Sequence, residues 1–258
     1  MNYNLVTYLK NDNDRSISEL ISGNIQEFED ENIINIKECL FRTCRELTKV
    51  NLPKCITIGM NAFRACTALS NVNLPECMTI GSGTFIGCEK LKQFNAPKVT
   101  TIRSSTFTEC KSLLSVELPE CVDVGEQAFF SCGALSNVNL PKCMTIGMNA
   151  FSYCTALSNV NLPECMTIGK LAFTSCEKLQ NVNIPKCTII KYGTFQYCNL
   201  LKKIDLNVVE KIEANAFWNC KLLECVKILN TETVCALADK DALSGTKIES
   251  GNGYIYVP

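Results

Sequence analysis

Hydrophobic and polar positions recur along this chain with a period of 22 residues. The clearest copies are LSNVNLPKCMTIGMNAFSYC at 135–154 and LSNVNLPECMTIGKLAFTSC at 157–176. Self-similarity at a fixed period predicts stacked repeats that contact only their neighbours, not a globular domain with one central core. The same register places a core phenylalanine in nine repeats, at Phe41, Phe63, Phe85, Phe107, Phe129, Phe151, Phe173, Phe195 and Phe217.

Each repeat begins with the pattern of a short strand. In the repeat that starts at Leu69, apolar residues two apart face the core and the asparagines between them face outward, which predicts a strand over 69–74. Pro75 ends this strand because it has no N–H for the neighbouring repeat. Further along, Gly81 is expected to permit the turn between two inward-facing side chains. That position does not strictly require a positive φ, because other repeats carry Arg103, Lys191 and Glu213 there.

Fifteen of the 18 cysteines are arranged in two columns and not in the pairs of a disulfide framework. Val99 and Val209 fill the gaps in the second column, so that site suits a small apolar side chain. Parallel Cβ directions within a column suit disulfides badly, and a straight file of thiols cannot surround a metal ion. We therefore expect buried, reduced thiols and no cofactor, in preference to disulfides or metal ligation. The first column is Cys44, Cys66, Cys88, Cys110, Cys132, Cys154, Cys176, Cys198 and Cys220, and the second is Cys55, Cys77, Cys121, Cys143, Cys165 and Cys187.

The repeat resembles a known family. The pattern Leu69-x-x-Val72-x-Leu74-x-x-Cys77 resembles the leucine-rich-repeat core, and Ile80-Gly81-x-x-Thr84-Phe85-x-x-Cys88 is similar to the BspA-like subtype of bacteria and protists. The resemblance covers residues 25 to about 228, with a unit one residue shorter than is usual for that subtype. It implies a leucine-rich-repeat solenoid: a β-rich, right-handed superhelix of 22-residue coils with a parallel sheet on its concave side.

Three regions follow from the repeat. Residues 1–24 form an N-terminal cap or extension, 25–228 the solenoid, and 229–258 a C-terminal cap that resembles tails of gut bacterial and prophage proteins which continue further. The first coil is degenerate, with Phe28 in the place of Val50 and Ile36 in that of Ile58, as a terminal coil should be. The alternating segment 254–257 is predicted to pair as the closing strand, and an exposed edge there could support end-to-end self-association. Cys225, on the last predicted repeat strand, is expected to face solvent and to be the most reactive thiol.

Outward-facing asparagines are the candidate binding residues. Stacked amides could offer donors and acceptors to a protein or carbohydrate ligand, or could simply bond to each other along the sheet. The second interpretation is the simpler one, and the sequence leaves both open. The residues are Asn71, Asn73, Asn137, Asn139, Asn159, Asn161, Asn181 and Asn183.

A column of alternating charge follows the prolines. Opposite charges stacked about 4.8 Å apart attract each other, so we expect the column to set the register of the coils. Its members are Lys54, Glu76, Lys98, Glu120, Lys142, Glu164 and Lys186.

Composition narrows the function. The net charge of −1 gives no reason to expect nucleic acid as partner, and no apolar run suggests membrane insertion. The chain has no histidine, which removes the Ser-His-Asp and Cys-His arrangements and the commonest general base. We expect a non-catalytic binding or adhesion scaffold that recognises a protein or carbohydrate surface. The alternative is a structural or assembly component, such as a prophage-encoded virion-associated protein. The resemblance alone suggests a cell surface or a phage particle as location.

Overall fold

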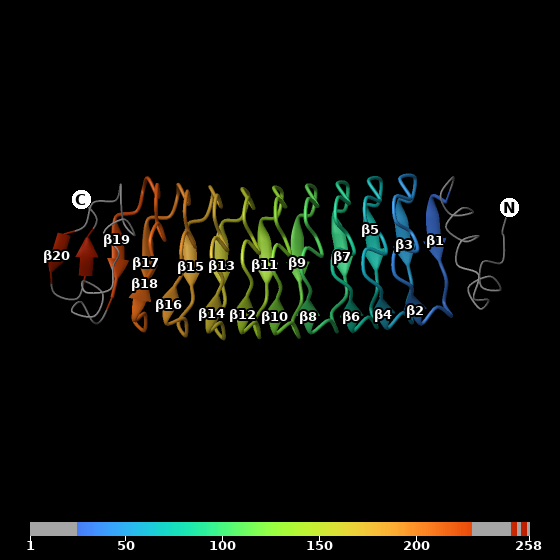
Figure 1. Cartoon of the computed structure of the whole chain (residues 1–258), viewed down its shortest axis with the longest axis horizontal. Coiled ribbons are helices and arrows are strands. Elements are labelled where there is room, and N and C mark those ends of the chain that lie inside the picture. The colour runs from blue at the N-terminus through green and yellow to red at the C-terminus, as the bar shows by residue number, and fades with distance from the viewer. Residues whose placement is uncertain (1–24, 229–248, 252–253, 257–258) are drawn as a thin grey trace.

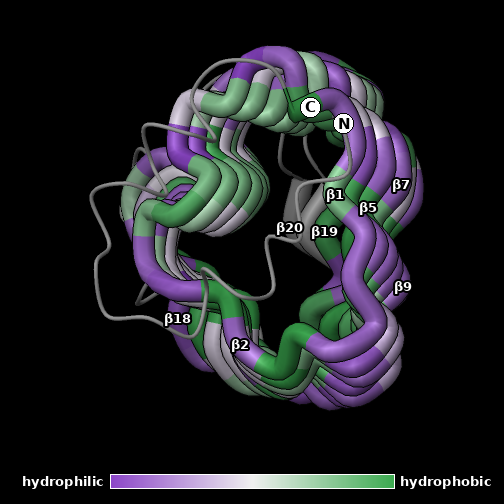
Figure 2. Tube along the Cα trace, turned by 90° about the vertical axis from the view of Figure 1, so that its right-hand side faces the viewer, coloured by the Kyte–Doolittle hydropathy of each residue, from purple (hydrophilic) through white to green (hydrophobic). Residues whose placement is uncertain are grey.

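The computed structural model describes residues 25–228, 249–251 and 254–256. These residues form a parallel β-solenoid with 22-residue coils, which confirms the predicted fold class. Figure 1 shows the coils side by side along a rod. In Figure 2, which looks along that rod, the coils superpose, and bands of like hydropathy run from one coil to the next. The expected cap at 1–24 and most of the expected cap at 229–258 lie outside the described residues.

Each coil contributes one three-residue strand, and these strands lie side by side in the upper row of arrows in Figure 1, called the long row below. The middle residue of each strand faces the core and the outer two face solvent, as the alternation predicts, although each strand is shorter than expected. The pairs Phe28–Val50 and Ile36–Ile58 confirm the predicted register of the first coil. The strands are β1 (Glu27–Glu29), β3 (Lys49–Asn51), β5 (Asn71–Asn73), β7 (Gln93–Asn95), β9 (Ser115–Glu117), β11 (Asn137–Asn139), β13 (Asn159–Asn161), β15 (Asn181–Asn183), β17 (Lys203–Asp205) and β19 (Cys225–Lys227).

A second, two-residue strand follows the second-column position in nine of the described coils, and these strands form the short row. This strand was not predicted, although the recurring β-branched Thr-Ile pair was its signal in the sequence. The strands are β2 (Asn35–Ile36), β4 (Thr57–Ile58), β6 (Thr79–Ile80), β8 (Thr101–Ile102), β10 (Asp123–Val124), β12 (Thr145–Ile146), β14 (Thr167–Ile168), β16 (Ile189–Ile190) and β18 (Lys211–Ile212).

The two rows of strands are interrupted at different junctions. The long row is divided into β1-β3-β5-β7, β9-β11, β13-β15 and β17-β19, and the last of these continues into β21 (Tyr254–Tyr256) and β20 (Glu249–Gly251). The short row is divided into β2-β4-β6, β8-β10-β12-β14 and β16-β18. No junction among the described coils loses both rows, so every pair of neighbouring coils keeps at least one set of strand hydrogen bonds.

Glycine has a different role from the one expected for Gly81. Its φ is not positive; instead, a Cβ added there would lie 2.4 Å from the backbone N of Met60 in the preceding coil. Glycine therefore permits close backbone approach. The short row breaks where the bulky residue at this position is Arg103 or Lys191. Where the residue is Glu213, β16 and β18 remain hydrogen-bonded, and the Glu213 carboxylate accepts a hydrogen bond from the backbone N–H of Tyr192 (2.9 Å).

The turns that follow the short strands carry a third set of bonds between coils. The N–H of Phe63 donates to the carbonyl of Thr84 (3.0 Å), and that of Ala65 to the carbonyl of Ile86 (2.7 Å). The phenylalanine bond recurs at every junction from Phe41 to Phe195, always with the N–H directed toward the following coil. Fifteen non-glycine residues in these turns have φ between +53° and +64°. These turns could not be predicted from the residue types, because L-residues rarely adopt this conformation.

The core is a continuous file of phenylalanine rings. The nine column phenylalanines are buried, and eight successive ring pairs stack with centroids 5.0 to 5.6 Å apart and planes within 12° of parallel. Offset stacking at this distance is favourable beyond the burial of the rings. Each ring from Phe41 to Phe195 contacts the rings of both neighbouring coils, so each coil completes the core of the next.

The alternating charges pair in twos and not continuously. Each bond joins a lysine to the glutamate of the preceding coil: Lys98–Glu76 (2.5 Å), Lys142–Glu120 (2.7 Å) and Lys186–Glu164 (2.5 Å). These junctions are also the ones where β5–β7, β9–β11 and β13–β15 pair. No ion pair joins Lys98 to Glu120 or Lys142 to Glu164, and the long strands are not hydrogen-bonded there. Direct ion pairs between column charges therefore form at three junctions and not along the whole column.

The C-terminal end of the long row is antiparallel. Strand β21 (Tyr254–Tyr256) pairs with β19, which confirms the predicted closing strand, and β20 (Glu249–Gly251) pairs with β21. The outer strand of this sheet is therefore β20. Cys225 occupies an outer position of β19, as expected, but it is half-buried and does not lie on an open edge, because it is paired with Tyr256 of β21.

The phenylalanine file predicts a large difference between inward and outward substitutions. Phe151→Ala should lower the free energy of unfolding by about 3 to 5 kcal/mol, because it leaves a cavity between two rings. Asn139→Ala, on the exposed face of β11, should change it by less than about 0.5 kcal/mol. Urea unfolding followed by circular dichroism measures both, and equal midpoints for the two variants would contradict the assignment.

The left-handed turn positions predict a stabilising change to glycine. Glu109 is exposed and has φ +61°, and Gly87 occupies the same place in the preceding coil with φ +70°. Glu109→Gly should raise the free energy of unfolding by roughly 1 kcal/mol, because relief of the left-handed strain exceeds the entropy that glycine adds to the unfolded chain. The control is Glu126→Gly, which should destabilise because Glu126 is exposed without a positive φ. Destabilisation by both changes would show that the turns store no such strain.

Candidate functional site

The predicted asparagines lie on one face of the long row of strands. They occupy the outer positions of β5, β11, β13 and β15, and the six on the last three strands are exposed. Asn71 and Asn73 are partly buried. The repeat thus brings residues that are far apart in the sequence onto a single surface.

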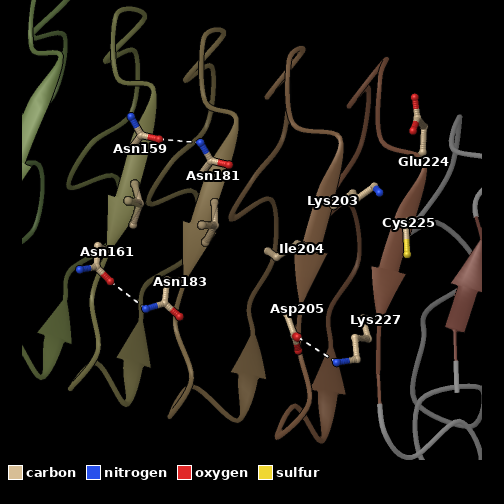
Figure 3. A pocket seen from close by; sticks show the side chains of 12 residues that line it. Asn159, Asn161, Asn181, Asn183, Lys203, Ile204, Asp205, Glu224, Cys225 and Lys227 are labelled. Atoms are coloured by element: carbon tan, nitrogen blue, oxygen red, sulfur yellow. Dashed lines mark hydrogen bonds and ion pairs between the residues drawn. The ribbon is translucent and has the colours of Figure 1, made fainter.

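Six of these eight side chains bond to a neighbouring amide. Asn183 Nδ2 donates to Asn161 Oδ1 (2.7 Å), and Asn181 Nδ2 donates to Asn159 Oδ1 (2.6 Å), as Figure 3 shows. Near the N-terminal end, the side chain of Asn73 donates to Asn51 (2.8 Å) and accepts from Asn95 (2.9 Å), and Asn71 donates to Gln93 (3.4 Å). Amide ladders therefore exist in two separate groups.

These ladders do not use up the bonding capacity of the amides. An asparagine side chain has two N–H donors and an oxygen with two acceptor positions. Within the ladder, Asn181 donates one bond and Asn159 accepts one. Each exposed amide keeps at least one donor or acceptor for another molecule, so the two interpretations of the asparagine columns are compatible.

Asn137 and Asn139 lie between the two ladder groups. They belong to β11, which is not hydrogen-bonded to β13. No side-chain bond joins either of them to another of the described residues. Val138 between them is only partly buried, whereas Val160 of β13 is buried. This junction therefore exposes unpaired amides beside apolar surface.

A shallow groove of about 930 Å³ lies over β13, β15, β17 and β19 (Figure 3). The described residues of its apolar lining are Val160, Val182 and Ile204. Val182 is partly buried because β15 and β17 are not hydrogen-bonded to each other. The four asparagines of β13 and β15 line one part of the groove.

Charged residues line the other part. They are Lys203, Asp205, Glu224 and Lys227, on or next to β17 and β19. Lys227 Nζ lies 3.3 Å from Asp205 Oδ2. Cys225 also lines the groove. The candidate face chosen from the sequence did not include these residues, although their signal was the replacement of asparagine by charge in the same columns.

Among the described residues, no group of three or more Cys, Asp or Glu side chains could hold a metal ion. The described part of the chain also contains no helix long and apolar enough to cross a membrane. The groove can thus provide hydrogen bonds, two charges of each sign and a small apolar area.

The cysteine columns lie in the core and form no disulfide among the described residues. Each thiol of the first column from Cys66 onward donates to the carbonyl of a phenylalanine in the preceding coil, as Cys66 does to Phe41 (3.0 Å). Burial raises the pKa of the Cys55 thiol to about 11 and that of Cys132 to about 12. Cysteine therefore serves here as a small apolar side chain with one weak donor.

Comparison with known proteins identifies the repeat. The sequence profile described as "BspA type Leucine rich repeat region (6 copies)" matches residues 21–133 and 122–244. No curated protein matched the chain.

Two solved structures illustrate the likeness. A leucine-rich repeat protein from Bacteroides ovatus ATCC 8483 is 21% identical over 81% of this chain and 74% of its own, with a TM-score of 0.50. A leucine rich cell surface protein from Faecalibacterium prausnitzii A2-165 is 24% identical over 82% of this chain and 74% of its own, with a TM-score of 0.44.

The buried thiols predict a loss of stability at alkaline pH. All fifteen column thiols have a raised pKa because burial disfavours the thiolate. In the unfolded chain the pKa is about 8.5, so their contribution is complete below that pH and is lost as pH rises toward the folded-state pKa, which is about 11 for Cys55 and about 12 for Cys132. Each thiol lowers the free energy of unfolding by roughly 1.4 kcal/mol per pH unit within this window. Urea midpoints measured from pH 7 to about pH 10 test this.

A valine variant provides the matched control for the alkaline loss. Val99 and Val209 already fill the column of Cys121, so Cys121→Val should fold and show a shallower decline with pH. A midpoint that stays constant from pH 8 to about pH 10 would contradict the buried thiol columns.

Proposed function

Because the chain belongs to the BspA-type leucine-rich repeat family, we propose that it is a recognition scaffold without a catalytic role, which binds another surface through its asparagine-rich strands. Repeats of this family typically serve protein interaction, and their scaffold is generally non-catalytic. The groove over β13, β15, β17 and β19 is the observation that carries the proposal.

The chemistry of the groove favours a polar ligand held by many weak contacts. Exposed amides offer donors and acceptors together, and the rim carries two positive and two negative charges. Among the described residues that line the groove, the apolar side chains are few and none is aromatic. Such a surface fits the backbone and polar side chains of a protein segment, or the hydroxyl groups of a carbohydrate. Adhesion to a host or microbial surface is the role we propose for this binding.

A structural role is the second candidate. The uninterrupted phenylalanine file and the turn bonds at every junction give a rod that could hold neighbouring domains apart, as in a virion-associated protein. Capsid and tail genes beside the coding gene would favour this role. An export signal encoded upstream would favour the surface scaffold.

Binding arrays combined with substitutions test the recognition proposal. The full chain is applied to glycan and protein arrays, and hits are measured again with the triple variant Asn137→Ala, Asn159→Ala, Asn181→Ala. Loss of these exposed amides should weaken binding by about tenfold or more, at roughly 1 kcal/mol for each lost hydrogen bond. The stability of the fold should be unchanged, because all three side chains are exposed.

The matched control changes the other row of strands. Thr79→Ala and Thr167→Ala remove exposed polar groups from β6 and β14 and should leave binding intact. Binding that survives the asparagine changes but not the threonine changes would place the site elsewhere. Hydrolysis of a glycan or ester by the purified chain would contradict a role without catalysis.

A further inference from the structure

A second surface, away from the asparagine face, carries a stripe of exposed apolar side chains. Each stripe residue follows a cysteine of the second column, or Val99 in that place. Its apolar members are between 39% and 53% exposed. Isolated exposed apolar residues are ordinary, whereas a contiguous patch marks an interaction site. The methionine stripe consists of Ile56, Met78, Thr100, Val122, Met144 and Met166.

The backbone holds most of the methionine stripe in register. The N–H of Met78 donates to the carbonyl of Ile56 (2.9 Å), and Met166 donates to Met144 (3.0 Å). Met144 donates in the same way to Val122 (2.8 Å). The spacing of the stripe is therefore the spacing of the coils. Methionine suits such a surface because its flexible, polarizable side chain packs against many shapes.

The alternating charges flank this stripe. Lys54 and Ile56 are both exposed, whereas Cys55 between them is fully buried. The same arrangement recurs in the following coils, so a charge lies beside each stripe residue. The sign of that charge changes from one coil to the next. A partner must therefore match both an apolar file and an alternating charge file.

We propose that the methionine stripe joins two copies of this chain in an antiparallel, two-fold symmetric dimer. The symmetry axis passes between the coil of Thr100 and the coil of Val122, so that these residues face each other. In this register every flanking charge meets the opposite charge. The apolar contacts are Ile56–Met166, Met78–Met144 and Thr100–Val122, the charge contacts are Lys54–Glu164, Glu76–Lys142 and Lys98–Glu120, and symmetry repeats each one.

Charge complementarity selects this partner and this register. A column of alternating sign is complementary to its own reverse, and a shift by one coil would oppose like charges. A second copy also has the same coil spacing, so the match holds across six coils. The net charge of −1 causes little repulsion between copies. The bonded pairs Lys98–Glu76 and Lys142–Glu120 would face each other as groups of four alternating charges.

The dimer would leave the candidate binding face accessible. The stripe leads into the short strands, whereas the asparagines lie on the long strands, and Figure 2 shows these rows on different sides of the coil. Two open grooves on one particle would allow bivalent attachment to a surface with repeated ligands.

Two complementary single variants test both the surface and the direction. Met78→Glu and Met144→Lys each place a charge against a methionine in the dimer and should weaken self-association by about tenfold or more. When the two variants are mixed, one contact becomes Glu–Lys and the other is again Met–Met, so dimers should return. Sedimentation equilibrium of the full chain over a roughly hundredfold range of concentration measures all three samples.

The control is Leu114→Glu, which introduces the same charge at an exposed apolar residue outside the stripe and should leave the dimer intact. Circular dichroism should give every variant the spectrum of the unmodified chain. A monomeric unmodified chain at the highest concentration would overturn the proposal. So would single variants that remain dimeric, or a mixture that stays monomeric.

Discussion

The structure depends on apolar side chains that no single coil can bury alone. A phenylalanine ring in this rod is covered by the rings of the coils before and after it, with centroids 5.0 to 5.6 Å apart. Leucine, isoleucine and cysteine columns run beside the rings and are equally buried. Stability in such an array is a sum of contacts between neighbours, so the surface residues are free to vary. This freedom allows asparagines, alternating charges and methionines to form separate files on one scaffold.

The same dependence explains how the coils tolerate interrupted strands. Arg103 and Lys191 prevent close backbone approach in the short row, and the long row opens at other junctions. The turns and the phenylalanines continue through all of these places. The openings in the long row leave Val138 and Val182 partly uncovered, and the groove lies over one of them. The candidate groove thus lies where strand pairing is interrupted, in a stack of coils whose core and turns are continuous.

Much of the fold follows from the sequence because the repeat shows the residue preference of each position many times. The period, the inward phenylalanines and the register of Phe28 with Val50 required only the alternation of apolar residues. The left-handed turns could not be predicted, because residues as different as Leu171 and Tyr153 adopt the same positive φ. The pairing of Lys98 with Glu76 but not with Glu120 was equally hidden, since the sequence presents both neighbours alike.

The candidate site was only partly predictable for a related reason. Asn159 and Asn181 belong to columns that the repeat makes obvious, but Asn-Val-Asn strands lie on both sides of a bonded junction and of an open one. Strand residues alone therefore do not determine where the groove forms. The charged residues of β17 and β19 could be assigned to the site only from the geometry of the last coils.

The turn bonds also give the rod an electrical polarity. At each junction the N–H groups of the turn point toward the C-terminal end and the carbonyl groups toward the N-terminal end, so the peptide dipoles add as they do along a helix. One edge of the solenoid should therefore be slightly positive at its C-terminal tip and slightly negative at the other. Rods placed side by side in opposite directions would cancel these fields, whereas rods placed in the same direction would add them.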